Sequence, residues 1–111
     1  MSLQPFDVVV VPFPYSDRLA EKRRPALVVS HPDLPARLNR VWVAMITSVP
    51  PSGLGDAVIG DVGAAGLPIA STLRASKLAT LDAGRVIRVA GRLSDPDQKL
   101  AQRALMACSG F

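Results

Sequence analysis

Cysteine and histidine are scarce in this 111-residue sequence, which contains one of each, Cys108 and His31. A single cysteine excludes an internal disulfide and a multi-cysteine zinc site, so a reducing cytoplasm is the expected compartment. A single histidine excludes a two-histidine acid–base pair. We interpret His31, which stands before Pro32 after an expected strand, as a structural turn residue. Cys108 is interpreted as a small core residue.

Long apolar runs and the common catalytic motifs are also missing. No stretch approaches the ~20 apolar residues that a membrane span requires. The valine run at residues 8–11 is too short for a signal peptide. The sequence contains no P-loop motif, no dinucleotide-binding glycine motif, no HExxH and no nucleophile elbow. We therefore expect no membrane segment, no metal ion and no cofactor.

Positive charge and hydrophobic residues are abundant instead. The 13 Lys and Arg residues against 9 Asp and Glu give a formal net charge of +4, and 49% of residues are hydrophobic. This content is sufficient for a core in one domain over residues 1–111. The cations gather at residues 18–24 and 74–92, each stretch containing one acid. Charge alone is compatible with two solvated faces or with a surface for a polyanion.

The residue pattern predicts a mostly β protein that ends in a helix. Short β-branched and apolar runs predict strands at 6–13, 25–29, 40–48, 57–59, 72–79 and 85–93. Residues 40–48 are apolar on both faces, and residues 31–39 are expected to form a turn. Because no long helical pattern connects the strands, we expect a mostly antiparallel sheet curled into a small barrel.

The expected C-terminal helix begins after Ser94, a typical N-cap residue, with Asp95 and Asp97 in its first turn, where the helix dipole favours acids. The apolar residues that recur at helical spacing are Leu100, Ala104, Leu105 and Cys108. These residues predict one apolar stripe that packs against the sheet.

Residues 14–24 form a polar, charged connection that is long for a hairpin, which is typical of a functional loop. The connection ends on Lys22, Arg23 and Arg24, directly before Pro25. A site built from guanidinium, ammonium and hydroxyl groups suits a substrate that already carries negative charge, because guanidinium binds phosphate bidentately. Single-stranded RNA fits this chemistry, since its own 2′-hydroxyl can be the nucleophile. An exposed Phe13 and Tyr15 could stack bases nearby.

Five segments, in order along nearly the whole chain, resemble the MazF/PemK family of bacterial toxins: DVVVVPFPYSD, KRRPALVVS, VWVAMITS, STLRASKLATLD and GRLSD. The resemblance implies a small SH3-like antiparallel β-barrel with a C-terminal α-helix, shared with CcdB-type toxins, and a homodimer. It also implies metal-independent cleavage of single-stranded RNA at short sequences, leaving 2′,3′-cyclic phosphate and 5′-hydroxyl ends. A cognate antitoxin is expected to bind through a disordered segment that occupies the RNA groove.

Two residues inherit catalytic roles from this resemblance. Arg24, before Pro25, matches the catalytic arginine of the family. Because an arginine pKa exceeds about 12, we expect it to stabilise charge or to act as an acid, rather than as a base. Thr47 matches a threonine that could contact a phosphate oxygen or the 2′-hydroxyl, although by itself it is an ordinary β-branched strand residue. The expected RNA-binding residues are Phe13, Tyr15, Ser16, Lys22, Arg23, Arg74, Ser76 and Lys77.

The sequence departs from the family at position 76. Some members have an acidic residue two positions after the arginine that matches Arg74, and this chain has Ser76 there. The general base is therefore unassigned: Asp17, Glu21 or a substrate group could serve, or none is required. Two alternatives remain open, a non-enzymatic CcdB-like toxin that binds DNA gyrase and a degenerate module that binds only RNA or antitoxin.

Overall fold

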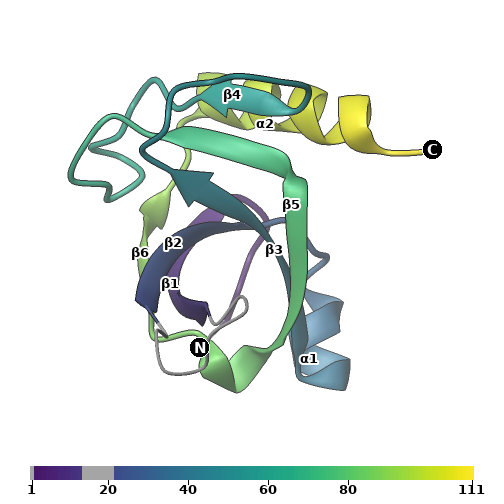
Figure 1. Cartoon of the computed structure of the whole chain (residues 1–111). Coiled ribbons are helices and arrows are strands. Elements are labelled where there is room, and N and C mark those ends of the chain that lie inside the picture. Colours follow the sequence, from purple (N-terminus) through teal and green to yellow (C-terminus); the bar gives the residue numbers. More distant parts are fainter. Residues whose placement is uncertain (1, 14–21) are drawn as a thin grey trace.

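Six strands form one sheet in the computed structural model, which describes residues 2–13 and 22–111. The strand order is β4-β5-β3-β2-β1-β6, and every neighbouring pair is antiparallel. The sheet curls into a half-barrel with a helix on one side (Figure 1), which confirms the expected fold class. The elements are β1 (Asp7–Phe13), β2 (Lys22–Val28), α1 (Asp33–Leu38), β3 (Arg40–Thr47), β4 (Asp56–Val58), β5 (Thr72–Asp82), the 3-10 helix η2 (Ala83–Arg85), β6 (Arg88–Arg92) and α2 (Asp95–Cys108).

Both faces of the sheet are apolar, and each packs into its own core. On β3, Ala44 and Ile46 belong to the helix-side core, which includes Ala101 of α2. Val43 and Met45 of the same strand belong to the second core, on the opposite face. Alternation along a strand sends successive side chains to opposite faces, so a continuous apolar run stabilises both cores. The expectation that residues 40–48 are apolar on both faces is confirmed.

Strand β2 begins at Lys22, three residues before the expected start at Pro25. Pro25 lies opposite Val10 of β1, and the Val10 carbonyl accepts a hydrogen bond from Ile87 on the other side. The Val10–Pro25 pair therefore requires no donor from the proline. Pairing with β3 begins only at Ala26. Proline is tolerated at position 25 because the missing N–H would point toward β3, and no β3 residue is paired with β2 there.

Helix α1 differs from the turn expected at residues 31–39. The His31 Nδ1 accepts a hydrogen bond from the Asp33 N–H at 3.0 Å, and Asn39, in the left-handed region at φ 53°, ends the helix. His31 thus has the structural role that we expected. Six residues are fewer than two helical turns, so no apolar periodicity marks α1 in the sequence.

Helix α2 begins as expected. The Ser94 Oγ accepts a hydrogen bond from the Asp97 N–H at 3.4 Å, which is the N-cap interaction. The carboxylate of Asp97 is only 5% exposed and accepts from the N–H groups of Gly60 and Asp61, both at 2.9 Å. These bonds attach the start of α2 to the segment after β4. No helix in the described part of the chain is long and apolar enough to cross a membrane.

The buried face of α2 corrects two expectations. Ala101 and Ala104 are buried, whereas Leu100 is exposed and Cys108 is an exposed free cysteine rather than a core residue. The buried stripe runs through Asp97, Ala101 and Ala104. Small side chains allow the helix to approach β4 and β5 closely, so the largest apolar residues of α2 do not mark its packed face.

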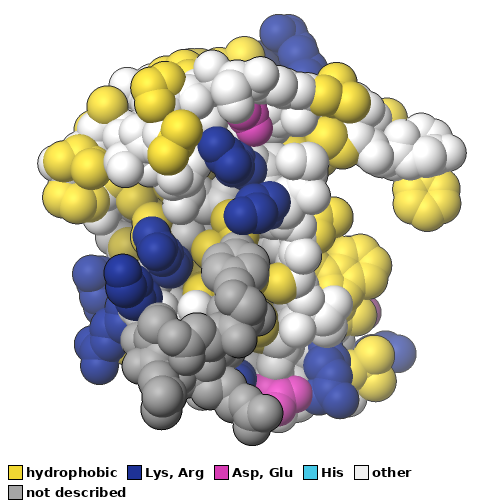
Figure 2. Space-filling model, in the orientation of Figure 1, with side chains coloured by type: hydrophobic (Ala, Val, Ile, Leu, Met, Phe, Trp, Pro, Cys, Tyr) yellow, Lys and Arg dark blue, Asp and Glu magenta, His cyan; other side chains and the backbone are white. Residues whose placement is uncertain are grey.

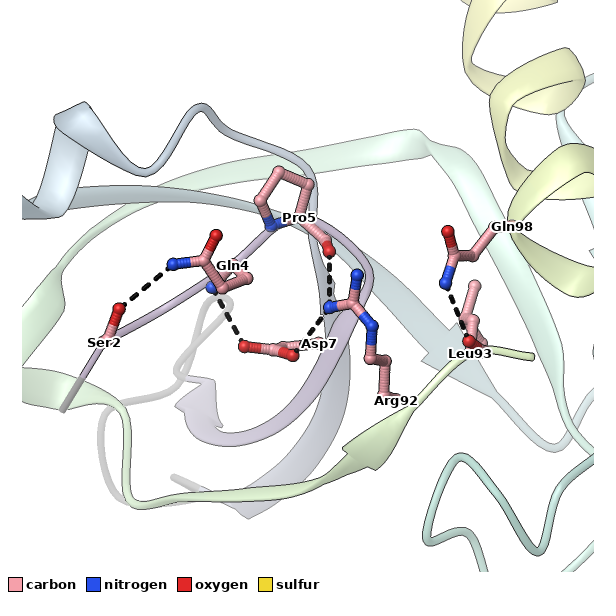
Figure 3. Close-up of polar contacts among 7 residues, drawn as sticks. All are labelled: Ser2, Gln4, Pro5, Asp7, Arg92, Leu93 and Gln98. Carbon is pink, nitrogen blue, oxygen red and sulfur yellow. Dashed lines mark hydrogen bonds and ion pairs between the residues drawn. The ribbon is translucent and has the colours of Figure 1, made fainter. Parts of the chain in front are cut away.

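A polar cluster joins the N-terminal segment to β6 (Figure 3). Arg92 of β6 donates to the Pro5 carbonyl at 3.0 Å and to the Asp7 carboxylate at 3.1 Å. The other oxygen of Asp7 accepts from the Gln4 N–H at 2.9 Å. Asp7 is largely buried, and this charge-assisted bonding compensates for its loss of water. The cluster fixes β6 against the start of β1.

Candidate functional site

The register of β2 against β3 brings Arg24 and Thr47 together. The two strands are paired only over Ala26–Val28, with Ala26 opposite Met45. If this register is continued for two residues beyond Ala26 and Met45, Arg24 lies across from Thr47. Because side chains alternate along a strand, both side chains are then on the face of the second core. Beyond Ala26 the strands no longer pair, which leaves space between them.

Strand β5 adds two cations to this space. Arg74 pairs with Met45, so its side chain is on the same face as Arg24 and Thr47. A β-bulge follows, because Met45 pairs with Arg74 while the neighbouring Ala44 pairs with Leu78. The extra residues at 75–77 carry Lys77 to the same place. The resulting pocket of about 160 Å³ is lined by Arg24, Met45, Ile46, Thr47, Arg74 and Lys77.

Four residues predicted from the sequence therefore line one pocket: Arg24, Thr47, Arg74 and Lys77. Lys and Arg side chains gather on the same face of the molecule, over β2, β5 and β6 (Figure 2). Among the described residues, no carboxylate lines the pocket. Three cations around one small depression attract an anion, and the planar arginine side chains match the geometry of a phosphate group.

The two central polar side chains, Arg74 and Thr47, differ in their hydrogen bonding. The Arg74 Nε is buried and has no hydrogen-bond partner among the described residues. A buried, unpaired guanidinium nitrogen is unfavourable until an anion compensates its charge. The Thr47 Oγ1 accepts a hydrogen bond from the Val49 N–H at 3.2 Å. A hydroxyl that accepts one bond still has its own hydrogen to donate, for instance to a phosphate oxygen.

The remaining predicted residues lie around the pocket or elsewhere. Phe13 ends β1, pairs with Lys22 and packs against the second core, on the same face as Arg24. Arg23 pairs with Pro12, one residue from Arg24, so alternation places it on the opposite face. Arg23 does not line the pocket.

Ser76 is exposed and does not line the pocket either. It belongs to the bulged residues 75–77, where the regular alternation of side chains along β5 is interrupted. The expected RNA-binding residues Tyr15 and Ser16, and the candidate bases Asp17 and Glu21, lie outside the described residues.

Sequence reasoning did not single out Asp56, an acid next to the pocket. Asp56 on β4 is directly opposite Arg74 on β5, so the two side chains share a face. Its Oδ2 accepts from the N–H groups of Ser52 at 2.9 Å and Gly53 at 3.2 Å. The Ser52 bond, with help from Gly53 and the charge of Arg74, holds the pKa of Asp56 below its ordinary value of 3.8, against the opposing effect of desolvation. The sequence offered no signal, because this proximity depends on strand pairing.

Two further observations bear on the choice of the candidate site. A larger pocket of about 630 Å³ lies between the N-terminal segment, α1 and η2, and none of its lining residues is charged. Across residues 2–13 and 22–111, no three His, Cys, Asp or Glu side chains lie together as metal ligands would. The pocket between β2, β3 and β5 is therefore the candidate site.

Comparisons with known proteins identify the family and the fold. The family model of PemK-like, MazF-like toxins of type II toxin–antitoxin systems matches residues 4–108. A mycobacterial endoribonuclease solved with its cognate antitoxin has a TM-score of 0.81 at 16% identity, covering 98% of this chain and 96% of that one. MazF from Deinococcus radiodurans has a TM-score of 0.78 at 18% identity, covering 100% and 99%. The Mycobacterium tuberculosis toxin MazF-mt6 has a TM-score of 0.73 at 18% identity, covering 89% of this chain and 91% of that one. No curated protein matches the sequence.

Proposed function

The chain belongs to the family of PemK-like, MazF-like toxins of type II toxin–antitoxin systems, and we propose that it is a cytoplasmic, metal-independent endoribonuclease that cleaves single-stranded RNA. The observation that carries this proposal is the pocket that Arg24, Arg74 and Lys77 line together with Thr47. Cationic groups and a hydroxyl that line one pocket are suited to bind one phosphate and stabilise additional negative charge on it.

The proposed reaction is attack by the 2′-hydroxyl of the substrate on the adjacent phosphorus. A bond forms between the 2′-oxygen and phosphorus, and the bond from phosphorus to the 5′-oxygen breaks. The 2′-hydroxyl loses its proton and the leaving oxygen gains one, giving 2′,3′-cyclic phosphate and 5′-hydroxyl ends. Arg24 and Arg74 stabilise the charge that develops on the phosphoryl oxygens, and Thr47 donates to one of those oxygens.

Proton removal is assigned to no side chain of the pocket. Arginine is an extremely weak base, because its pKa exceeds about 12. In the proposed mechanism, catalysis arises from orientation of the 2′-hydroxyl and from charge stabilisation. Asp17 and Glu21 remain candidates for the base.

RNA is proposed to extend from this pocket along the same face. Phe13 offers an aromatic ring for stacking near the exposed Lys22. Tyr15 and Ser16, which follow Phe13 closely in the sequence, are also proposed to contact RNA. Arg23 and Ser76 would contact RNA only at the edge of the binding surface.

The decisive experiment incubates the purified protein with mixed-sequence single-stranded RNA in excess chelator and maps the ends. We expect cyclic phosphate and 5′-hydroxyl ends, and a loss of at least about 100-fold in cleavage for Arg24→Ala, as for removal of a principal charge stabiliser. Arg37→Ala is the matched control, because Arg37 is an exposed arginine of α1. RNA left intact across many sequences would refute the proposal. Growth inhibition without cleavage would instead favour the gyrase-binding alternative.

We also propose a cognate antitoxin whose disordered segment covers the pocket. The cations that would bind RNA phosphates also attract acidic side chains of a peptide, so both ligands compete for Arg24, Arg74 and Lys77. An antitoxin peptide should therefore inhibit cleavage in proportion to its occupancy. Cleavage that persists at saturating peptide would contradict this arrangement.

A homodimer is proposed from the exposed apolar side chains on β3 and β5. Trp42 is 51% exposed and Leu78 is 60% exposed, and both line a shallow pocket with Ala79 and Thr80. A second copy that covers this face would remove the apolar surface from water. Light scattering at micromolar concentration should give twice the monomer mass, and Trp42→Glu should reduce it to the monomer. A monomeric wild type would contradict the proposal.

A further inference from the structure

A carboxylate stands beside one of the pocket arginines without lining the pocket. Asp56 and Arg74 are paired residues on adjacent antiparallel strands, an arrangement that places their Cβ atoms about 4.5–5.5 Å apart. The two side chains are not in direct ion-pair contact, since no pair within 4.0 Å joins them in the described part of the chain. Their interaction is therefore electrostatic, across the sheet.

Arg74 has few other groups to determine its orientation. Its Nε is buried and has no hydrogen-bond partner among the described residues. Its other neighbour across the sheet is the apolar Met45. Among the described residues, Asp56 is the acid that strand pairing places beside Arg74, and its negative charge stabilises the guanidinium there.

We propose that Asp56 is a positioning residue of the RNA-cleaving site, which orients the Arg74 guanidinium toward the pocket and supplies the carboxylate that position 76 lacks. This inference rests on the proposed endoribonuclease function. The acid is placed on a different strand from the one that the family resemblance indicates, but beside the same arginine.

The bonding of Asp56 explains why it positions Arg74 rather than removing a proton. Its Oδ2 is occupied by the N–H groups of Ser52 and Gly53, which fix the carboxylate relative to β4. The same donors stabilise the ionised form and lower the pKa, so the group is a weak base at neutral pH. A fixed carboxylate that is ionised at neutral pH is suited to hold a cation.

A double-mutant cycle tests this role. The RNA site mapped with the wild type is placed in a short oligonucleotide, and kcat and KM are measured for Asp56→Asn, Arg74→Gln and the double variant. Asp56→Asn retains a side-chain oxygen for the Ser52 and Gly53 N–H groups. We expect it to lower kcat by about 10- to 100-fold through misplacement of the guanidinium, with KM changed by less than about threefold. In the Arg74→Gln background, the same change should alter kcat by less than about twofold.

The matched control is Asp61→Asn. The Asp61 carboxylate also accepts a backbone hydrogen bond, from the Ala64 N–H at 3.0 Å, but it has no arginine across the sheet. We expect wild-type kcat for this variant. If Asp56→Asn fails to fold, Asp56→Ser replaces it, since a hydroxyl is still an acceptor for the turn.

A spectroscopic measurement separates positioning from a general effect on stability. The Arg74 Nε–H resonance, identified by its loss in Arg74→Gln, should broaden or shift in Asp56→Asn but not in Asp61→Asn. An equal loss of kcat with and without Arg74, or wild-type kcat in Asp56→Asn, would overturn the inference. A wild type that cleaves no RNA would instead refute the proposed function and leave the resonance as the test of Asp56.

Discussion

Thr47 and Thr72 are neighbours across β3 and β5, yet only Thr47 lines the pocket. Thr47→Val keeps the β-branched shape and removes the hydroxyl. We expect cleavage to fall about 10- to 100-fold through loss of one donor to the phosphate. The free energy of unfolding should decrease by about 0.5–1.5 kcal/mol, because the Val49 N–H loses its acceptor. Thr72→Val should retain cleavage, and equal activity of the two variants would remove Thr47 from the mechanism.

The lowered pKa of Asp56 predicts a specific acid dependence of stability. A carboxyl group with a lower pKa in the folded state stabilises the fold at pH values above its unfolded pKa, here about 3.8, and this contribution is lost as pH falls through the folded value. Thermal unfolding of wild type and Asp56→Asn should therefore differ most at pH 5–7. The difference should shrink progressively below pH 3.8. A difference that grows toward low pH would contradict the sign of this shift.

The sequence motifs alone could predict Arg24, Thr47, Arg74 and Lys77 as candidate site residues, but not that Asp56 lies beside them. The four predicted residues stand in short segments whose order along the chain resembles a known family. The approach of Asp56 to Arg74 arises from the pairing of β4 with β5, two strands separated by a long loop. Sequence spacing carries no information about such a pairing, so the acid beside the pocket could only be found in the fold.

At the scale of elements, the bulge in β5 brings Lys77 to the pocket but not Ser76. Lys77→Ala should weaken RNA binding and reduce the dependence of the logarithm of Kd on the logarithm of salt concentration by about 0.7, the contribution of one phosphate contact on a single strand. Ser76→Ala alters only the edge of the binding surface, so it should leave the salt dependence unchanged and weaken binding less than Lys77→Ala does. An equal effect of both variants would show that lining the pocket does not determine RNA contact.

The packing of the segment after β4 onto β6 depends on Gly66. Its backbone is in the left-handed region at φ +70°, and a Cβ atom there would lie 2.1 Å from the Ala90 carbonyl oxygen. Gly66→Ala should therefore lower the free energy of unfolding by more than about 1 kcal/mol. Gly84→Ala, with no atom within 4 Å of the added methyl, is the control. Urea unfolding measures both, and similar midpoints would contradict the predicted clash.

The strands were more predictable than the helices, for physical reasons. Runs of β-branched residues such as 8–11 favour extended backbone and buried positions on either face of a sheet. Helix α1 is too short for periodicity to appear. In α2 the packed face consists of Ala101 and Ala104, so Leu100 and Cys108 indicated the wrong stripe. A helical pattern is identified in a sequence from its large apolar side chains, whereas the close packing of this helix requires small ones.

For the whole molecule, the formal charge of +4 and the three cations of the pocket determine the expected response to salt. Three phosphate contacts on single-stranded RNA give a slope of about −2, so Kd should rise about 20-fold between 50 and 200 mM salt. Arg24→Ala should reduce this slope by about 0.7, whereas Arg103→Ala, an exposed cation of α2, should leave it unchanged. Equal slopes for Arg24→Ala and Arg103→Ala would mean that net charge, rather than the pocket, governs binding.

The separation of β2 from β3 beyond Ala26 has a consequence for how such a protein evolves. The opening is formed by main chain that stops pairing, while the apolar residues that stabilise the sheet lie in the two cores on either side. The polar side chains at the opening can therefore be exchanged at a smaller cost to folding than the core residues beside them. A lineage can lose, restore or redirect activity by single substitutions at these positions while the same frame persists.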